Sequence, residues 1–338
     1  MEIDLINNVI TDIDTLMQRY IIRDGFVFSQ VTFPANIYDA IVIKNPPHTP
    51  CSSPKIIDSA KSLQEHIDFI NKYKIEKALI IAENIDFITK CPSLKYFRII
   101  PSDNAKNDFD YSPLYHMPAV KSLSCATVYG AHYELTTSID YSKINDLESV
   151  SISGSGHFNY NTIRNLKTLG ISGYKESNLT NMFSGDNLDS LMIIQSNIKS
   201  LEGLQTAPKI KCLYLYYNSH LNDISALRAI KESITALRIE NCNQIKDFSV
   251  LSELKNLEML ELSGNNTLAN LDFIKSMKNL KTFIFSMNVL NGDLSPSQSL
   301  PFVRSLKDRK HYNLKDKNLP KGEFVHGNES IELWRRYD

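Results

Sequence analysis

The chain has 338 residues, of which 42% are hydrophobic and 22% charged, a composition typical of a folded globular protein that excludes wholesale disorder. Its 37 basic and 38 acidic residues leave a formal net charge of −1, which argues against a nucleic-acid binder with its usual basic face. No apolar run approaches the roughly 18–20 residues that a membrane span needs, so we predict no span.

The start of the chain and its cysteines predict a cytoplasmic location. The opening stretch, MEIDLINNVITDID, is acidic and lacks the basic and apolar regions of a signal peptide. The five cysteines form an odd set without a CxxC pair, which fits reduced thiols better than a disulfide framework.

Residues 1–74 carry mixed patterns. Asp24-Gly25 is a favourable pair for a hairpin turn between two strands. Apolar residues at helical spacing, from Ile57 to Ile70, predict an amphipathic helix. The predicted elements are strands over 19–31 and 37–43, a Pro-rich loop over 45–54 and a helix over 56–74.

From residue 76 to residue 288 the sequence repeats the frame L-x-x-L-x-L-x-x-N, with other apolar residues replacing Leu at some positions. The fourth positions of the last five copies are 22, 24, 23 and 23 residues apart, whereas the upstream steps vary from 18 to 27. A near-constant step predicts one structural unit per copy. The fourth positions are Leu79, Phe97, Leu123, Val150, Leu169, Leu191, Leu213, Leu237, Leu260 and Phe283, with Ala40 in an outlying eleventh copy.

The frame predicts a short strand in each copy. Positions 4 and 6 are apolar almost throughout and point to one side of a strand, whereas positions 3, 5 and 7 point to the other. One strand cannot bury its apolar side alone, so stacked copies must supply the core. Asn at position 9 is expected to hydrogen-bond to neighbouring turns, and Cys242 at this position is interpreted as structural. The return segments are apolar at every third residue, which predicts 3₁₀ turns.

These repeats resemble the leucine-rich repeat family, in particular its short bacterial, internalin-like type, over roughly residues 76–290. The resemblance implies an α/β-type solenoid with a curved parallel sheet of about ten strands and 3₁₀ or irregular turns on the convex side. Residues 1–74 would form an N-terminal cap, 75–290 the solenoid and 291–338 a C-terminal cap anchored by Trp334. The basic residues of this last region are interspersed with Asp308 and Asp316, which predicts a solvated face.

Motifs that carry chemistry are missing from the sequence. There is no P-loop, dinucleotide fingerprint or HExxH, and the eight histidines lack the spacing of metal ligands. The segment from Ser153 to His157 resembles a nucleophile elbow but lacks the first Gly, and we interpret it as a strand-exit turn. We therefore predict no catalytic, cofactor or metal site, and no enzymatic activity.

The side of the sheet formed by positions 3, 5 and 7 is the predicted binding face. Its middle copies carry mainly Ser and Gly, whereas later copies concentrate Met, Tyr, Arg and Glu; Tyr and Arg dominate binding hot spots. The alternative is that these residues only favour strands, and that Arg238 and Glu261 pair at roughly 0.2–1 kcal/mol. The predicted partner-binding residues are Met192, Ile194, Tyr214, Tyr216, Arg238, Glu240, Met259 and Glu261.

We predict a non-enzymatic bacterial interaction module that binds another protein on its concave face and is a monomer when free. Proteins with similar repeats include inhibitors and immunity-type partners that mask a toxin or an enzyme. Two alternatives stay open. One is a secreted or surface adhesin of internalin type, and the other is a small enzymatic activity in residues 1–74, where Asp12, Asp14 and Asp58 form no constellation.

Overall fold

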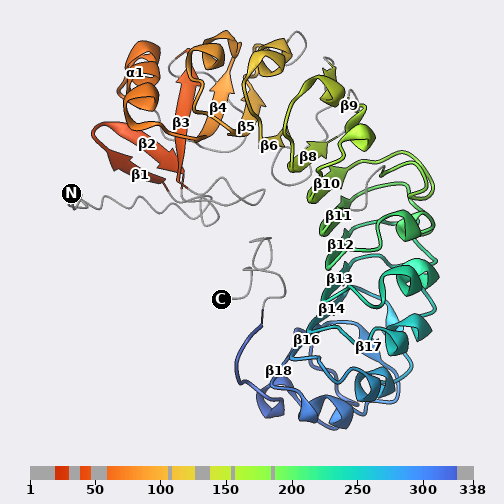
Figure 1. The fold of residues 1–338 in the computed structure, drawn as a ribbon. Helices are drawn as coiled ribbons and strands as arrows, with labels where there is room; N and C mark the ends of the chain where they lie inside the picture. The colour runs from red at the N-terminus through yellow and green to blue at the C-terminus, as the bar shows by residue number, and fades with distance from the viewer. Residues whose placement is uncertain are drawn as a thin grey trace. The chain divides into compact units, whose positions relative to one another are not determined.

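The computed structural model describes residues 20–29, 39–46, 59–105, 109–125, 138–153, 157–183 and 187–325. The chain forms two compact units, Met1–Ile163 and Arg164–Asp338. In each unit the strands lie side by side in a sheet, and short helical turns connect them (Figure 1). Every helix in the described part of the chain is too short or too polar to span a membrane. The predicted boundaries at residues 74 and 290 stay predictions.

The sheet of the first unit begins with the predicted hairpin. Asp24 and Gly25 turn it with φ values of 52° and 81°, the positive values that a two-residue hairpin turn favours. The strand after the hairpin pairs antiparallel with it, and the later pairs are parallel. In sheet order the strands are β1 (Tyr20–Arg23), β2 (Phe26–Ser29), β3 (Ala40–Asn45), β4 (Lys77–Ala82), β5 (Tyr96–Pro101), β6 (Ser122–Ser124) and β8 (Ser149–Ser153), while β7 (Ile139–Asp140) pairs with β9 (His157–Phe158).

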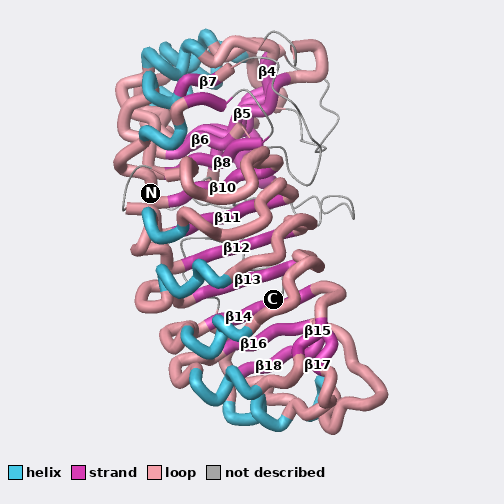
Figure 2. The backbone as a smooth tube through the Cα atoms, turned by 90° about the vertical axis from the view of Figure 1, so that its right-hand side faces the viewer, coloured by secondary structure: helices cyan, strands magenta, loops and turns pink. Residues whose placement is uncertain are grey.

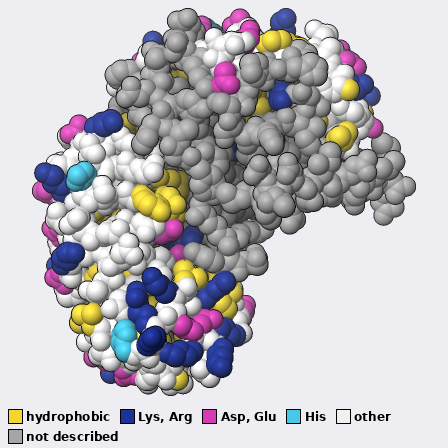
Figure 3. All heavy atoms as spheres, turned by 180° about the vertical axis from the view of Figure 1, so that it is seen from behind, with side chains coloured by type: hydrophobic (Ala, Val, Ile, Leu, Met, Phe, Trp, Pro, Cys, Tyr) yellow, Lys and Arg dark blue, Asp and Glu magenta, His cyan; other side chains and the backbone are white. Residues whose placement is uncertain are grey.

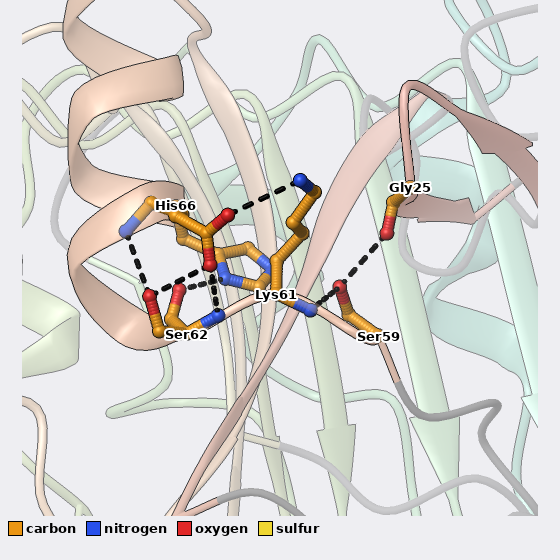
Figure 4. Close-up of polar contacts among 6 residues, drawn as sticks. Gly25, Ser59, Lys61, Ser62 and His66 are labelled. Atoms are coloured by element: carbon orange, nitrogen blue, oxygen red, sulfur yellow. Dashed lines mark hydrogen bonds and ion pairs between the residues drawn. The ribbon is translucent and has the colours of Figure 1, made fainter.

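Helix α1 (Leu63–Tyr73) begins later than the predicted range 56–74, because Ser62 caps it. The backbone N–H of Glu65 donates to Ser62 Oγ at 3.3 Å, and the N–H of Ser62 donates to Glu65 Oε2 at 2.8 Å (Figure 4). This reciprocal capping box fixes the first turn of the helix. Residues 59–62 precede the helix, and residues 47–58, which include most of the predicted loop over 45–54, lie outside the described residues.

Strand β4 is displaced by one residue from its predicted frame. Ala78 rather than Leu79 pairs with Phe97 of β5, and Leu79 pairs with Arg98. The prediction that Ile80 and Ala82 belong to the open face is therefore wrong. The stretch KALIIA is apolar at five successive positions, so an alternating pattern cannot distinguish its two sides.

The predicted outlying copy at Ala40 is a strand, β3, but it also departs from the frame, since Val42 pairs with Leu79. Farther along the unit the predicted register is confirmed, because Phe97, Leu123 and Val150 pair in turn. The displaced frame places a second buried apolar cluster on the side of the sheet that carries Leu79. Its members are Val27, Ala40, Val42, Leu79, Ile81 and Ile100.

In the second unit the predicted register is confirmed at every copy. The strands cross the unit as parallel rungs (Figure 2), and their fourth-position side chains, from Leu169 to Phe283, pair in turn and are 0% exposed. One continuous apolar core follows. The sheet extends one strand further than predicted, because Val303 pairs with Phe283. In sheet order the strands are β10 (Thr168–Ser172), β11 (Ser190–Ile194), β12 (Cys212–Tyr216), β13 (Ala236–Glu240), β14 (Met259–Ser263), β16 (Thr282–Phe285) and β18 (Phe302–Ser305), while β15 (Thr267–Leu268) pairs with β17 (Asn288–Val289).

The return segments contain the predicted 3₁₀ turns. In one of them Leu221, Ile224 and Leu227 are at most 2% exposed, so the period of three marks the buried side. The 3₁₀ turns are η2 (Asp86–Lys90), η3 (Ser112–His116), η4 (Tyr141–Lys143), η5 (Tyr160–Thr162), η6 (Leu204–Thr206), η7 (Ser225–Ile230), η8 (Ser249–Glu253), η9 (Asp272–Ser276), η10 (Ser295–Ser299) and η11 (Asp316–Asn318).

A ladder of buried polar side chains runs along the strand exits of the second unit, as predicted from position 9. Asn218 Oδ1 accepts from the backbone N–H of Ser196 at 3.0 Å, and Asn218 Nδ2 donates to the carbonyl of Ile193 at 2.9 Å. Cys242 is 0% exposed, and its Sγ lies 3.7 Å from the carbonyl oxygen of Leu215, which confirms its structural role.

The ladder departs from the frame in the copy that ends at Asn265. Asn265, at position 9, is exposed, and the next residue, Asn266, donates to the carbonyls of Cys242 at 3.1 Å and Ile245 at 2.8 Å. Gly264 has a φ of 135°, which a residue with a Cβ rarely adopts, and this exit therefore takes a different path. The prediction of Asn265 as the ladder residue is wrong by one position.

The end of the second unit packs around Tyr312, which is 4% exposed. Its hydroxyl accepts from the N–H of Val289 at 3.0 Å and donates to the carbonyl of Met287 at 3.2 Å. The predicted anchor, Trp334, lies outside the described residues. Charged side chains of both signs mix at this end of the molecule (Figure 3), and Lys321 Nζ lies 2.7 Å from Asp316 Oδ1, in line with the predicted solvated face.

The ladder gives a first prediction. Replacement of Asn218 by Ala leaves the buried N–H of Ser196 and the buried carbonyl of Ile193 without their side-chain partner. The free energy of unfolding should therefore fall by about 1–3 kcal/mol or more. Urea denaturation measures this change. Asn222, whose amide donates to His220 in an exposed position, provides the matched control. Asn222→Ala should change stability by less than about 0.5 kcal/mol, and equal losses in both variants would contradict the ladder.

The first unit gives a pH prediction. Burial lowers the pKa of His66 below its ordinary value of 6.5, because desolvation disfavours the charged ring, which is 2% exposed and contacts Phe26 at 5.1 Å between centroids. The unfolded chain therefore binds more protons here, and the free energy of unfolding should fall as the pH drops below 6.5. Hydrogen bonds from Ser62 lower the pKa of Glu65 to about 2. The contribution of Glu65 to stability is therefore lost only at a more acidic pH than the range in which His66 titrates.

Denaturation at a series of pH values checks this dependence. His66→Gln should flatten the slope between about pH 7.5 and pH 5, whereas the same change at exposed His220 should leave the slope unaltered. A slope that survives in His66→Gln assigns the pH dependence to another group.

Candidate protein-binding face

The strand register gathers the predicted partner-binding residues on one surface of the second unit. Met192, Tyr214, Arg238 and Glu261 pair in turn across β11, β12, β13 and β14. The next row along the same strands contains Ile194, Tyr216 and Glu240, and Met259 starts β14. Because side chains alternate along a strand, all eight lie on the side of the sheet opposite the leucine core. This surface, the tyrosine face, is defined by Met192, Ile194, Tyr214, Tyr216, Arg238, Glu240, Met259 and Glu261.

The polar groups of the tyrosine face form a linked set. The guanidinium carbon of Arg238 lies 5.0 Å from the ring centroid of Tyr214, a cation–π distance. Arg238 Nε donates to Glu261 Oε2 at 2.7 Å, and Tyr214 donates its hydroxyl proton to Glu240 Oε2 at 2.9 Å. Ser263 Oγ also donates to Glu261 Oε1 at 3.2 Å. These contacts fix the rotamers across three adjacent strands, β12, β13 and β14.

The burial of the tyrosine face corrects the prediction that its side chains are open to solvent. Met192 is 6% exposed and Tyr214 5%, while Arg238, Met259 and Glu261 are at most 1% exposed. In-register neighbours about 4.8 Å apart shield one another, which sequence rows do not reveal. The accessible area of the tyrosine face comes from its half-buried residues, Ile194, Tyr216 and Glu240.

Burial also changes the energetics of Arg238 and Glu261. An exposed cross-strand pair contributes roughly 0.2–1 kcal/mol, but removal of one partner from a buried pair costs about 3–5 kcal/mol. Arg238 Nη2 lies 2.6 Å from Glu261 Oε2, with the two side chains 1% and 0% exposed. The cost of about 3–5 kcal/mol for a buried pair therefore applies here. A loss of partner affinity in Arg238→Ala would reflect destabilisation of the fold as well as the loss of a contact with the partner.

Sequence reasoning missed Tyr217, the most exposed aromatic residue beside the face. It follows β12 with a φ of 53° and is 47% exposed, and its ring centroid lies 4.5 Å from that of Tyr216. The left-handed region costs a residue with a Cβ roughly 1–2 kcal/mol. The signal was present, since Gly173 and Gly264 occupy the same frame position with φ values of 72° and 135°.

We searched the described residues for metal ligands and reactive thiols. No group of three or more His, Cys, Asp or Glu residues is arranged to hold a metal ion within the described ranges. Burial raises the pKa of both Cys91 and Cys242 to about 11, so these thiols stay protonated near neutral pH. Asp12, Asp14 and Asp58 lie outside the described residues, as does 154–156 of the interpreted turn.

No family model and no curated protein matches the chain. Among solved structures, the functional domain of InlJ from Listeria monocytogenes is 14% identical with a TM-score of 0.45, over 67% of this chain and 51% of that chain. The internalin InlF from Listeria monocytogenes is 14% identical with a TM-score of 0.40, over 76% of each chain. The plant peptide hormone receptor RGFR1, in complex with RGF2, is 14% identical with a TM-score of 0.25, over 68% of this chain and 54% of that chain.

Internalins are thus among the structural neighbours of this chain, which spans about half the length of the InlJ structure. The strand register shows the fold. The chain is a leucine-rich-repeat solenoid of the type that its repeats predict.

The buried ion pair gives a further prediction. Arg238→Met should lower the free energy of unfolding by about 3–5 kcal/mol, because the Glu261 carboxylate stays buried after its counter-charge is removed. Adding Glu261→Leu should restore most of the loss. The exposed pair of Arg228 and Glu253, at 2.8 Å, is the control, with a coupling of about 0.2–1 kcal/mol. Double-mutant cycles in urea measure both couplings, and equal values would show that burial is unimportant.

Proposed function

We propose that this protein is a non-enzymatic interaction module that binds a partner protein at the tyrosine face and the adjoining Tyr217. Support comes from the chemistry of the accessible part, where Ile194, Tyr216 and Tyr217 provide apolar area beside the Glu240 carboxylate. Aromatic residues with a polar group supply large, rigid contact area and dominate binding hot spots. The buried residues beneath them provide a fixed support.

The observation that carries the proposal is the exposed aromatic side chain of Tyr217. Its aromatic side chain is 47% exposed in the left-handed region, which the same frame position also adopts in other copies, at Gly173, Gly264, Gln195 and Asn241. Its ring contacts Tyr216, which is itself half-buried. Because Tyr217 is an exposed aromatic residue where the other copies carry Gly, Gln or Asn, we infer that its side chain serves recognition.

Substitution of Tyr217 by Gly separates folding from binding. The change relieves the strain, so the free energy of unfolding should stay level or rise by about 1 kcal/mol. Affinity for the partner should fall at least about tenfold, the loss of roughly 1.4 kcal/mol or more expected for a hot-spot aromatic residue. Unchanged affinity in both Tyr217→Gly and Tyr216→Ala would contradict the proposed face.

Site-specific photo-cross-linking in the native host identifies the partner. A photoreactive phenylalanine analogue at position 217 should capture one protein in stoichiometric yield. The same analogue at Lys255, an exposed turn residue, is the matched control and should not capture it. Identical adducts from both positions, or none from position 217, would exclude the tyrosine face.

An inhibitor or immunity-type role is the finer form of this proposal, in which the face masks a toxin or an enzyme. Addition of the protein should then suppress the activity of the captured partner. We also propose a cytoplasmic location, since Cys91, Cys125 and Cys242 are buried as thiols, as in a reducing compartment. Cell fractionation tests the location, and recovery in the secreted fraction would favour the adhesin alternative.

A further inference from the structure

The row of the tyrosine face that contains Glu240 continues to the end of the second unit. Ser263 pairs with Glu240, and the backbone N–H groups of Ser286 and Leu306 extend the parallel ladder with hydrogen bonds of 3.1 and 2.8 Å. Each residue of the row therefore lies beside the next, about 4.8 Å away. The row ends at Leu306, which is 38% exposed. In order, the row is Ile194, Tyr216, Glu240, Ser263, Ser286 and Leu306.

The chain around the end of this row is strongly basic. Residues 304–321 contain seven Lys or Arg and two Asp, whereas the whole chain has a net charge of −1. Figure 3 shows Lys and Arg side chains gathered at this end of the second unit. Lys307 and Lys310 are exposed, and half-buried Arg309 donates from Nη2 to the carbonyl of Ser286, a member of the row, at 3.4 Å. Lys307, Arg309 and Lys310 define a surface that we call the basic end.

Both carboxylates of this region are already engaged within it. Asp316 Oδ1 accepts from the backbone N–H of Ser305 at 2.7 Å and lies 2.7 Å from Lys321 Nζ. Asp308 Oδ1 accepts from the backbone N–H of Asp316 at 2.9 Å. Among the described residues, no carboxylate forms an ion pair with the basic end. Its positive charge is therefore available to a ligand.

The arrangement of charges favours an acidic segment of protein over a uniform polyanion. Carboxylates bind guanidinium and ammonium groups through charge-assisted hydrogen bonds, so acidic side chains complement the basic end. A nucleic acid or an anionic membrane that followed the row would also bring negative charge to Glu240, where a like charge is unfavourable.

The length of the row fixes the spacing that such a segment needs. Strands β12, β13, β14, β16 and β18 follow one another in the sheet. Four strand spacings, about 19 Å, therefore separate Tyr216 from Leu306, and an extended peptide spans this distance with about six residues.

We propose that the partner protein recognised at the tyrosine face also binds the basic end, through Asp or Glu side chains about six residues from the segment that contacts Tyr216 and Tyr217. The aromatic part of this contact rests on the proposed function, whereas the preference of the basic end for acidic side chains does not.

Binding of a fluorescein-labelled hexaglutamate peptide at low ionic strength tests this preference. Fluorescence anisotropy should detect saturable binding, and Lys307→Glu with Lys310→Glu should weaken it at least about tenfold. Lys199→Glu with Lys255→Glu, at exposed residues of the return segments, makes the same change in net charge and should weaken binding less than about twofold.

Three results of this measurement would overturn the proposal. Equal losses in the two double variants, or no saturable binding, would leave the basic end a solvated surface. Tighter binding of duplex DNA or of phosphatidylserine vesicles, with the same dependence on Lys307 and Lys310, would assign the basic end to a nucleic acid or a membrane.

Photo-cross-linking from both ends of the row tests the shared partner. The photoreactive phenylalanine analogue at position 306 should capture the same protein as the analogue at position 217. The two mapped adducts should lie about six residues apart, with Asp or Glu beside the adduct from position 306. Capture at 217 but not at 306 would overturn this inference and leave the proposed function intact. No capture at 217 would contradict the proposed function, while the hexaglutamate measurement still decides the acidic preference of the basic end.

Discussion

The structure of the second unit depends on one constraint, the exact repeat of parallel strand pairing along the chain. Each return of the backbone places Leu213 beside Leu237 and Leu237 beside Leu260, so that every apolar side chain covers its neighbours. The buried amide of Asn218 then satisfies backbone groups of the previous copy at 2.9–3.0 Å. A slip of one residue would expose the leucines and leave these groups without partners, and therefore both the core and the ladder oppose it.

The same constraint creates a surface on which distant residues become neighbours. Once the leucines occupy one side of each strand, the intervening residues must share the other side in fixed rows. Tyr214, Arg238 and Glu261 thereby meet within hydrogen-bond and cation–π distance, although each is separated from the next by more than twenty residues of sequence. The fold thus sets the geometry of the tyrosine face, and the residue types in these rows set its chemistry.

Much of this architecture could be predicted from the sequence, because regular spacing reports register directly. The phase of β4 could not, since KALIIA lacks alternation, and the start of α1 depended on a capping box that periodicity does not detect. The residues of the tyrosine face were predicted from frame positions 3, 5 and 7 of the repeats. Their burial was not, because it depends on packing above and beside the sheet. Tyr217 was missed because the frame stopped at the core and face positions, and its position was not compared with that of Gly173 and Gly264 in other copies.

Engineered cysteine pairs test the register, the central claim of this account, most directly. Ile194 and Tyr216 are paired neighbours, so cysteines at both positions lie about 4.8 Å apart, within the range of a disulfide. Glu240 lies one strand further, about 10 Å from Ile194, beyond that range. This register predicts rapid oxidative cross-linking of Ile194→Cys/Tyr216→Cys and none of Ile194→Cys/Glu240→Cys. Equal cross-linking of both pairs, or cross-linking of the second alone, would contradict it.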